Sequence, residues 1–566
     1  MNPSTALATV LVDELARHGV REAVLCPGSR SAPLAYALQE ADRAGRIRLH
    51  VRVDERSAGF LALGLAKLTR RPVPVVTTSG TAVANLHPAV LEAHHAAVPL
   101  LVLSADRPPE LRGTGANQTT TQPGLFGMPV RWLHDLGAPE RRPGQVAVWR
   151  STASRACAAA TGVLGGTPGP VHLNLPLREP LVPTADAEPW PESLDGRPGG
   201  APWVRTDRAI AVAEPLDDEP RTLVLLGDLP DPSAAAAVAS LVEATGWPLL
   251  AEPFGALDRA TVTPHGPLLL TATDWLEQHL PARVLVVGRI TLSRAVAALL
   301  RRPEVRVEVI SPAHGWPDPG HVAARVHPWA AIAGHEHLSV DRAWADAWHE
   351  AGRTVAAAAQ PVIAGAWPSG LGVAAAVAGA LPAHATLFVG SSNAARDLDL
   401  ALTPTALATG AAVVASRGLA GIDGCVSTSV GLALAHPARP TYALMGDLTF
   451  LHDSNGLLIG PHEPRPDLTV VVPNDDGGGI FTLLEPGEPA RAADFERIFG
   501  TPTGTSLTDL CRAHGVDHLR ATTREELTAA VAARPDGLRV VEVPLPRDGH
   551  RDLHARLREA AAAALA

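Results

Sequence analysis

Short apolar runs alternate with longer amphipathic stretches along most of the chain. Before residue 182, apolar runs at 23–25, 73–78 and 100–104 are each followed by turn-forming residues. Near-continuous apolar strands separated by helices are typical of parallel sheets that are covered on both faces. The pattern therefore predicts an α/β fold. Later runs of the same kind are found at 222–226, 248–251, 284–287, 305–310, 386–389, 441–445 and 468–472.

Two breaks in this pattern indicate domain boundaries. Residues 183–208 are rich in Pro, Gly and acidic residues, which is typical of a linker, and a weaker linker covers 355–368. Ser369 then resembles the N-cap of an alanine-rich helix. Because 566 residues are too many for one core, we predict three doubly wound domains, at 1–182, 209–354 and 369–566. The first and third resemble distant structural relatives.

The composition limits the class of protein. Apolar residues make up 46% and charged residues 19%, which allows a large core and excludes general disorder. A net charge of −10 argues against nucleic acid as a partner, because phosphate binding needs a basic face. Lys67 is the only lysine, so the cations are almost all arginines. A GC-rich genome would explain this, although arginines in pockets also favour bidentate carboxylate partners.

The sequence also predicts a cytoplasmic location. The four cysteines have no CxxC spacing, which fits a reducing compartment and indicates neither a zinc site nor a disulfide framework. The N-terminal amphipathic stretch contains Asp13 and Glu14 and is therefore not a signal peptide. No uninterrupted apolar run reaches the ~18 residues that span a bilayer, so we expect no membrane span.

Acidic residues follow two of the predicted strands. Asp447 comes at the end of one, and Asp475 follows the next strand and precedes three glycines. Mg²⁺ prefers hard oxygen ligands and shares them with phosphates. We therefore predict a metal site of Asp447, Asp475 and the Gly477 carbonyl, with Gly477 and Gly478 close to a diphosphate. Each motif alone is also common in turns, and Mg²⁺ and Mn²⁺ both remain open.

Glu55 follows a strand near the N-terminus and begins a helix-like stretch. A largely buried glutamate has the raised proton affinity needed to hydrogen-bond a ring nitrogen of thiamine diphosphate (ThDP) and promote its activation. Alternatively, an acid at this position interacts with the helix dipole, as we expect of Asp54. Glu55 and the acidic pair together favour a ThDP and metal site.

Several segments resemble the SEPHCHC synthase (MenD) family, 2-succinyl-5-enolpyruvyl-6-hydroxy-3-cyclohexene-1-carboxylate synthases of the ThDP-dependent decarboxylase superfamily. The resemblance covers essentially the whole chain and is weakest in the middle domain. The most specific motifs are Gly-Ala-Asn-Gln at 115–118 and Ser-Arg-Gly-Leu-Ala-Gly-Ile-Asp-Gly at 416–424. The other matching segments are at 26–34, 54–56, 78–85, 104–110 and 446–453.

The resemblance implies a transferase of menaquinone biosynthesis. Such an enzyme decarboxylates 2-oxoglutarate and adds the resulting succinyl carbanion 1,4 to isochorismate. It implies catalysis by Glu55 and a homodimer or tetramer with its active site at the subunit interface. The implied coenzyme contacts are Glu55, Ser79, Gly80, Ser392, Ile422, Asp447, Leu448, Asp475, Gly477 and Gly478. The implied substrate contacts are Ser29, Arg30, Arg107, Asn117, Gln118, Arg294, Ser392, Arg396, Arg417 and Phe481.

The chain departs from related patterns at the metal site and in the middle domain. Leu448 replaces the usual glycine after Asp447, and Asp475-Asp476 adds negative charge, which leaves open the oxygen that binds the metal. Ser293 stands where some relatives carry a lysine. Three alternatives remain: a ThDP lyase acting on pyruvate, a non-catalytic ThDP-fold protein, and an NAD-dependent oxidoreductase. The last is weak because no GxGxxG follows a strand.

Overall fold

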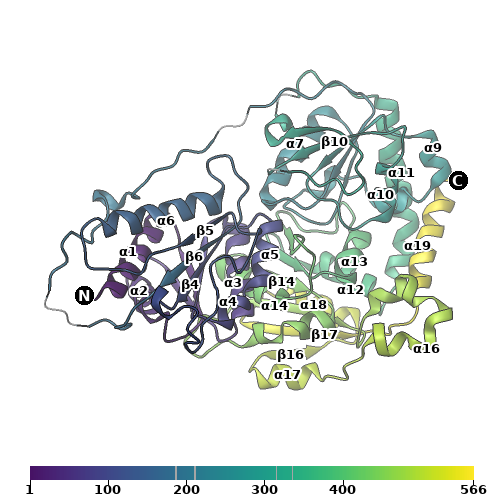
Figure 1. The fold of residues 1–566 in the computed structure, drawn as a ribbon. Helices are drawn as coiled ribbons and strands as arrows, with labels where there is room; N and C mark the ends of the chain where they lie inside the picture. The colour runs from purple at the N-terminus through teal and green to yellow at the C-terminus, as the bar shows by residue number, and fades with distance from the viewer. Residues whose placement is uncertain (185–187, 210–211, 314, 334) are drawn as a thin grey trace. The chain divides into compact units, whose positions relative to one another are not determined.

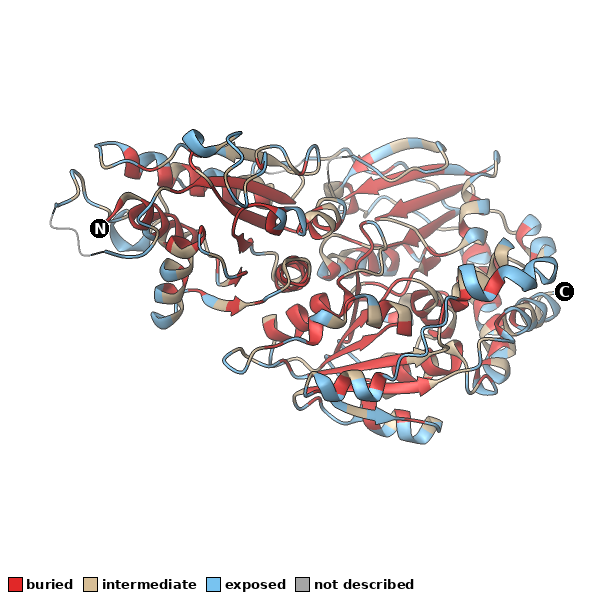
Figure 2. Cartoon of the chain, turned by 60° about the horizontal axis from the view of Figure 1, so that its bottom comes forward, coloured by how far each residue is buried: buried red, intermediate tan, exposed pale blue. Residues whose placement is uncertain are grey.

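Three parallel β-sheets with helices on their faces make up the computed structural model, which describes residues 1–184, 188–209, 212–313, 315–333 and 335–566 (Figure 1). The predicted α/β class is therefore confirmed. Figure 2 shows that the strands are buried and that exposed residues are concentrated in helices and loops. Among the described residues, no helix is both long enough and apolar enough to cross a bilayer.

The first sheet has six parallel strands in the order β2-β1-β3-β4-β6-β5. Helices α1, α2 and α6 share a core with one face of the sheet, and α3 packs on β1 and β3. The strands are β1 (Glu22–Leu25), β2 (Arg48–Val51), β3 (Val73–Thr77), β4 (Leu100–Asp106), β5 (Trp132–Asp135) and β6 (Pro170–Pro176). The helices are α1 (Pro3–Arg17), α2 (Ala32–Arg43), α3 (Glu55–Thr69), α4 (Thr81–Ala84), α5 (His87–His95) and α6 (Gln145–Thr161).

The second sheet has five strands in the order β11-β10-β9-β7-β8. Its two faces belong to different cores: one contacts α7, and the other joins a core that includes α11 and α12. The strands are β7 (Thr222–Leu226), β8 (Leu249–Ala251), β9 (Arg283–Val287), β10 (Arg306–Ser311) and β11 (Ala323–Pro328). The helices are α7 (Ala235–Thr245), α8 (Gly266–Leu269), α9 (Thr273–Gln278), α10 (Arg294–Leu300) and α11 (Arg342–Ala364).

The third sheet has the order β13-β12-β14-β15-β17-β16, which repeats the order of the first sheet strand for strand. This repetition supports the predicted kinship of the two domains. Ser369 caps α12 as predicted, since its side chain accepts the Gly372 amide at 3.1 Å. The strands are β12 (Thr386–Val389), β13 (Ala412–Ala415), β14 (Thr441–Leu444), β15 (Leu468–Asn474), β16 (Asp517–Arg520) and β17 (Leu538–Pro544). The helices are α12 (Gly370–Ala380), α13 (Asn393–Ala401), α14 (Cys425–Ala435), α15 (Asp447–His452), α16 (Ala492–Phe495), α17 (Leu507–Ala513), α18 (Arg524–Ala532) and α19 (His550–Ala564).

The chain forms two compact units rather than one for each sheet. Unit 1 comprises Met1–Ile210, Gly418–His436 and Asp453–Arg465, and unit 2 comprises the remaining residues. Residues 355–364 lie within α11, so most of the second predicted linker is helical, because its alanine-rich sequence favours a helix. Part of the first predicted linker, 185–187, lies outside the described residues.

Helix α14 belongs to unit 1 because it packs closely along α3. A β-carbon on Gly64 would lie 2.2 Å from the Thr428 carbonyl oxygen, and one on Gly431 would lie 2.4 Å from the Leu61 carbonyl oxygen. Glycine at both positions allows the two backbones to touch. This contact supports α3, the helix that begins with Glu55.

Replacing Gly64 by alanine is expected to destabilise the protein by roughly 1–3 kcal/mol, because the new methyl group overlaps the α14 backbone. Gly379→Ala is a matched control on a helix, since a β-carbon there meets no atom within 4 Å. That control should be neutral or stabilise by up to ~1 kcal/mol. Thermal and urea unfolding would measure both, and a neutral Gly64→Ala would contradict the close contact.

Candidate coenzyme and substrate site

Glu55 is the first residue of α3, which follows β2 after a short turn. Asp54 caps this helix as predicted, since its carboxylate accepts the Arg56 amide at 2.9 Å and the Ser57 amide at 3.4 Å. Asn455 donates to the same carboxylate at 2.8 Å. The structure leaves Glu55 partly buried, whereas the sequence predicted a largely buried side chain. The reason is its position in the first helical turn, where the chain itself covers only part of it.

Asp453 connects the start of α3 to the start of α14. Its buried carboxylate accepts the Ser427 amide at 2.7 Å, and the Ser427 and Ser57 hydroxyls donate to it at 3.1 and 3.3 Å. Burial raises the pKa of Asp453 to about 6 despite these donors. The backbone that carries Glu55 is therefore held by a buried polar contact as well as by helix packing.

Two arginines lie at the carboxyl ends of the first sheet. Arg30 is 7% exposed, and its Nη1 donates to the Leu177 carbonyl at 2.9 Å. Its Nε has no partner among the described residues. Burial and, after it, the charge of Arg107 lower the pKa of Arg30. Two mutually repelling guanidiniums with an unused donor favour the binding of an anion.

The loop that follows β4 contacts the loop after β3 in both directions. The Ser79 hydroxyl donates to the Gln118 carbonyl at 2.8 Å, and the Gln118 amide donates to the Ser79 carbonyl at 3.1 Å. The Asn117 carbonyl accepts from Arg107 Nη2 at 3.0 Å. Five of the predicted contacts, Ser79, Gly80, Arg107, Asn117 and Gln118, therefore belong to one pair of loops.

Asp447 and Asp475 lie together at the carboxyl ends of β14 and β15. Asp447 is 3% exposed, and its Oδ2 has no hydrogen-bond partner among the described residues. Burial raises its pKa to about 6. Burial and the neighbouring Asp447 raise the pKa of Asp475 to about 7. Two neighbouring carboxyl groups whose pKa values are both raised favour a shared cation.

Glycines surround this acidic pair because no side chain would fit. A β-carbon on Gly479 would lie 1.9 Å from Asp475 Oδ2, and one on Gly478 would lie 2.2 Å from the Phe499 carbonyl oxygen. Gly477 has a φ of +150°. Its carbonyl accepts the Gly479 amide at 3.1 Å, which leaves one lone pair for the predicted metal. A short 3₁₀ helix, Gly479–Leu483, starts here.

Fewer acidic groups converge here than a protein-only metal site would need. In the described part of the chain, no three His, Cys, Asp or Glu side chains are placed to share an ion. Mg²⁺ needs six oxygen ligands and commonly takes several from phosphates and water. The two carboxylates and one carbonyl therefore suit a metal that is bound together with a diphosphate.

Arg417, which is buried, and Arg396, which is half-buried, form a second group of cations. Burial and, after it, the charge of Arg417 lower the pKa of Arg396. Arg396 Nη1 donates to the carbonyl of Ser392, the residue that precedes α13 with a left-handed φ of +78°. Arg417 is 4% exposed, and its Nε has no partner in the described ranges. This pair resembles Arg30 and Arg107 in having an unused donor.

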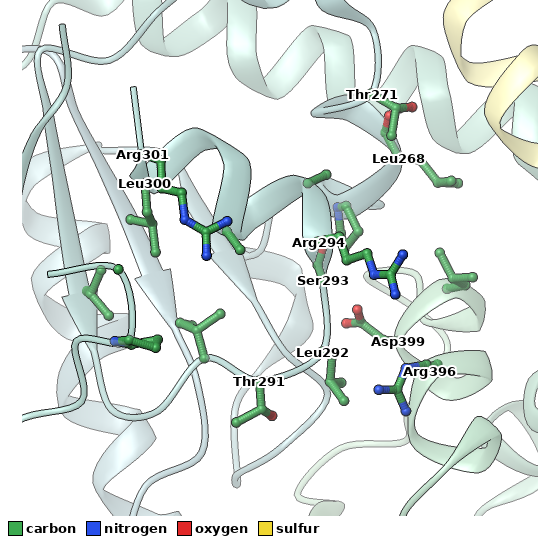
Figure 3. Close-up of a pocket in the computed structure, with 18 of the residues that line it drawn as sticks. Leu268, Thr271, Thr291, Leu292, Ser293, Arg294, Leu300, Arg301, Arg396 and Asp399 are labelled. Carbon is green, nitrogen blue, oxygen red and sulfur yellow. The ribbon is translucent and has the colours of Figure 1, made fainter. Parts of the chain in front are cut away.

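A cavity of about 570 Å³ in unit 2 is lined by Arg294, Arg396 and Asp399 among many apolar side chains (Figure 3). Arg294 and Arg396 extend toward Asp399 from α10 and α13. The Arg294 side chain is 79% exposed, and its ion pair with Glu485 is long, at 4.0 Å. This side chain is therefore weakly held. Phe481 contacts Phe499 beside the glycines, with ring centroids 5.4 Å apart.

Comparison with known proteins agrees with this geometry. Residues 5–125 match the family described as "Thiamine pyrophosphate enzyme, N-terminal TPP binding domain", and residues 404–543 match its C-terminal TPP binding domain. SEPHCHC synthases of Saccharopolyspora erythraea and Kineococcus radiotolerans are 50% and 51% identical to the chain, with 100% of each chain covered. That of Rhodococcus jostii is 49% identical, with 99% covered. The chain belongs to the SEPHCHC synthase family.

Membership of the SEPHCHC synthase family confirms the resemblance and the prediction of a ThDP-dependent enzyme. It also removes the NAD-dependent alternative. The individual contacts stay predictions, although the structure brings them together in two groups. Unit 1 carries Ser29, Arg30, Glu55, Ser79, Gly80, Arg107, Asn117, Gln118 and Ile422. Unit 2 carries Arg294, Ser392, Arg396, Arg417, Asp447, Leu448, Asp475, Gly477, Gly478 and Phe481.

Several supporting residues were missed from the sequence. Gln122 is fully buried and accepts the Gly80 amide at 3.0 Å. Glu92 accepts the amides of Gly418 and Leu419 at 2.8 and 2.7 Å. Glu92 could have been found from the sequence, because it is an acidic residue within a largely apolar helical stretch. Ser293, at the position of a lysine in some relatives, caps α10 by accepting the Val296 amide at 3.3 Å.

Replacing Asp475 by asparagine should stabilise the metal-free protein, because it removes one of two repelling buried carboxylates. Folded pKa values of about 6 and 7 lie above those of unfolded Asp. The stabilisation of the folded protein by this pair is therefore fully present below pH ~4 and is lost as pH rises through about 7. In the variant, the free energy of unfolding should fall less steeply as pH rises. ThDP with Mg²⁺ should also no longer stabilise the variant.

Melting temperatures between about pH 5 and about 7.5, with and without ThDP and Mg²⁺, would measure these effects. Asp494→Asn is the matched control, since Asp494 is exposed. A variant that keeps the full stabilisation by ThDP with Mg²⁺ would contradict the assignment of Asp475 to the metal.

Proposed function

We propose that this protein is a ThDP-dependent SEPHCHC synthase. It decarboxylates 2-oxoglutarate and joins the succinyl unit to isochorismate by 1,4-addition, releasing CO2. The observation that carries this proposal is that the buried Arg417 has an unused donor in the unit that also bears Asp447 and Asp475 at its strand ends. Such an arrangement suits a polyanionic substrate beside a coenzyme diphosphate and its metal.

The residues present fit a divalent metal and a diphosphate. The unpartnered oxygen of Asp447 and the raised pKa of Asp475 both call for a cation. In this proposal Asp447, Asp475 and the Gly477 carbonyl hold Mg²⁺ or Mn²⁺. The coenzyme, when bound, supplies the electron sink for the loss of CO2. Ser79, Gly80, Ser392, Ile422, Leu448 and Gly478 are the further proposed coenzyme contacts.

Glu55 is the proposed catalytic residue. Its carboxyl group shares a proton with a ring nitrogen of the aminopyrimidine and so controls the protonation state of the coenzyme. The capped first turn of α3 fixes the backbone that carries this side chain. The contacts made by Asp453 and Asn455 hold that turn against the rest of unit 1.

The arginines are proposed to bind the substrate carboxylates. Each charge-assisted hydrogen bond contributes roughly 1.5–3 kcal/mol, so two such bonds separate a dicarboxylate from pyruvate by several orders of magnitude. The carboxylate that leaves as CO2 would be left without an arginine, because pairing would stabilise it. The proposed contacts are Ser29, Arg30, Arg107, Asn117, Gln118, Arg294, Ser392, Arg396, Arg417 and Phe481.

We also propose a homodimer, or a tetramer of two dimers, whose active sites form at the subunit interface. The predicted coenzyme contacts are divided between the two units, with Glu55 in one and the acidic pair in the other. In the superfamily that the chain resembles, these halves meet between subunits. Light scattering of the protein with and without ThDP would determine the oligomeric state.

Glu55→Gln should abolish most turnover and leave ThDP and Mg²⁺ binding intact, because the amide keeps the shape but cannot share a carboxyl proton. Glu40→Gln makes the same change at an exposed position of α2 and is the control. Turnover should be followed by isochorismate consumption, and binding by calorimetry. Near-normal turnover of Glu55→Gln would refute its catalytic role.

Purified protein should consume isochorismate only when ThDP, Mg²⁺ and 2-oxoglutarate are all present, with release of CO2. Each component should be omitted in turn. Release of CO2 from 2-oxoglutarate with isochorismate untouched would refute the proposed acceptor. Turnover of pyruvate alone would support the alternative lyase.

A further inference from the structure

The loop between β9 and α10, residues 288–293, is held by a buried acid. Glu252 is 7% exposed and directly follows β8. Its Oε1 accepts the amides of Thr291 and Leu292, each at 2.6 Å. Arg259 fixes the same strand end by donating to the carbonyls of Glu252 and Ala251 at 3.0 and 3.2 Å. The loop is thus attached to the middle sheet through one carboxylate.

The same loop contacts Arg417 through both side chain and backbone. Arg417 Nη2 donates to the Thr291 hydroxyl at 2.7 Å, and Arg289 Nη1 donates to the Arg417 carbonyl at 3.1 Å. The guanidinium also lies over the Phe254 ring, 5.5 Å from its centroid. The adjoining residue Gly255 pairs with Val413 of β13 at 2.8 and 3.1 Å. All these groups belong to unit 2.

The hydroxyl of Thr291 joins Arg417 to Glu252. Because it accepts from Arg417, its own proton is available to Glu252 Oε2, which lies 3.3 Å away. The chain of contacts therefore runs from a cation through a hydroxyl to a carboxylate. It fixes one side of the guanidinium and leaves Arg417 Nε without a partner in the described part of the chain.

Charged groups gather around Arg417. Burial and, after it, the charge of Arg417 lower the pKa of Arg396, a half-buried neighbour. Arg294, a further cation, belongs to the helix that follows the loop. Glu252, Asp397 and Asp399 are buried acids of this region. Burial raises the pKa of Glu252 to about 8, and Arg417 opposes this rise, so the Glu252 carboxyl group acts here through its hydrogen bonds.

We propose that Glu252 and Thr291 are positioning residues that aim Arg417 at a substrate carboxylate. The middle sheet then has a part in substrate selection and is not only a scaffold. The inference rests on the proposed function, since it takes Arg417 as a substrate contact. A purely structural role of Glu252 would need only its bonds to the loop amides, and these do not involve the Thr291 hydroxyl.

Thr291→Val tests the inference because it keeps the shape and the backbone amide and removes only the hydroxyl. We expect the KM for one substrate to rise roughly tenfold, because a loosened arginine no longer presents its donors in a fixed direction. The kcat should change by less than about threefold. Thr291→Ser keeps the hydroxyl and should restore a KM close to that of the wild type. Thr261→Val, whose hydroxyl donates to the Asp258 carbonyl instead, is the matched control.

Glu252→Gln provides a second, independent measurement, and it serves alone if Thr291→Val does not fold. It should raise the KM for the same substrate. The double variant should show less than the sum of the two single effects, because both act on one chain of contacts. Additive effects, or a rise in KM for the other substrate, would overturn the inference.

The result separates the two proposals. If the wild type is inactive and neither 2-oxoglutarate nor isochorismate binds in calorimetry with ThDP and Mg²⁺ present, the proposed function fails. If the wild type is active and Thr291→Val has an unchanged KM, the positioning role alone fails. The positioning role also fails if Thr291→Ser is impaired as much as Thr291→Val, since the defect would then come from packing.

Discussion

The parallel direction of every strand places the site. In a wholly parallel sheet all carboxyl ends lie along one edge, and loops there are free to carry polar groups. Glu55 and Arg30 follow strands of the first sheet, Asp447 and Arg417 follow strands of the third, and Glu252 follows one of the second. The apolar strands supply the rigid support, and each of these predicted site residues lies within five positions of the end of its strand.

Groups of like charge lie close together at these edges. Burial and, after it, the charge of Asp447 raise the pKa of Asp475, and burial and then the charge of Arg417 lower the pKa of Arg396. Groups of like charge in such positions are costly unless a partner neutralises them. In the proposed function, a metal diphosphate would neutralise the acids and a polycarboxylate would neutralise the arginines. Affinity and specificity would then arise from the same electrostatic imbalance.

How far the sequence alone leads depends on whether a feature is local. The strand at 222–226, the Ser369 cap and the acids at 447 and 475 were predicted because each is marked by its immediate neighbours. The contact of Gly64 with Thr428 and the relay from Glu252 to Arg417 join distant residues, and no local pattern marks them. Residues 355–364, in the weaker predicted linker, form the end of a helix, because an alanine-rich stretch is typical of both linkers and helices.

The packing of α14 on α3 has a consequence for how such a chain can evolve. The two sheets with the same strand order suggest an ancient duplication, after which the halves could have remained exchangeable modules. The glycine contacts prevent this, because α14 lies in the sequence of the third domain and is buried against the first. A gene divided near residue 369 would separate the two helices. Exchange of either half for a relative's would therefore have to preserve both glycines.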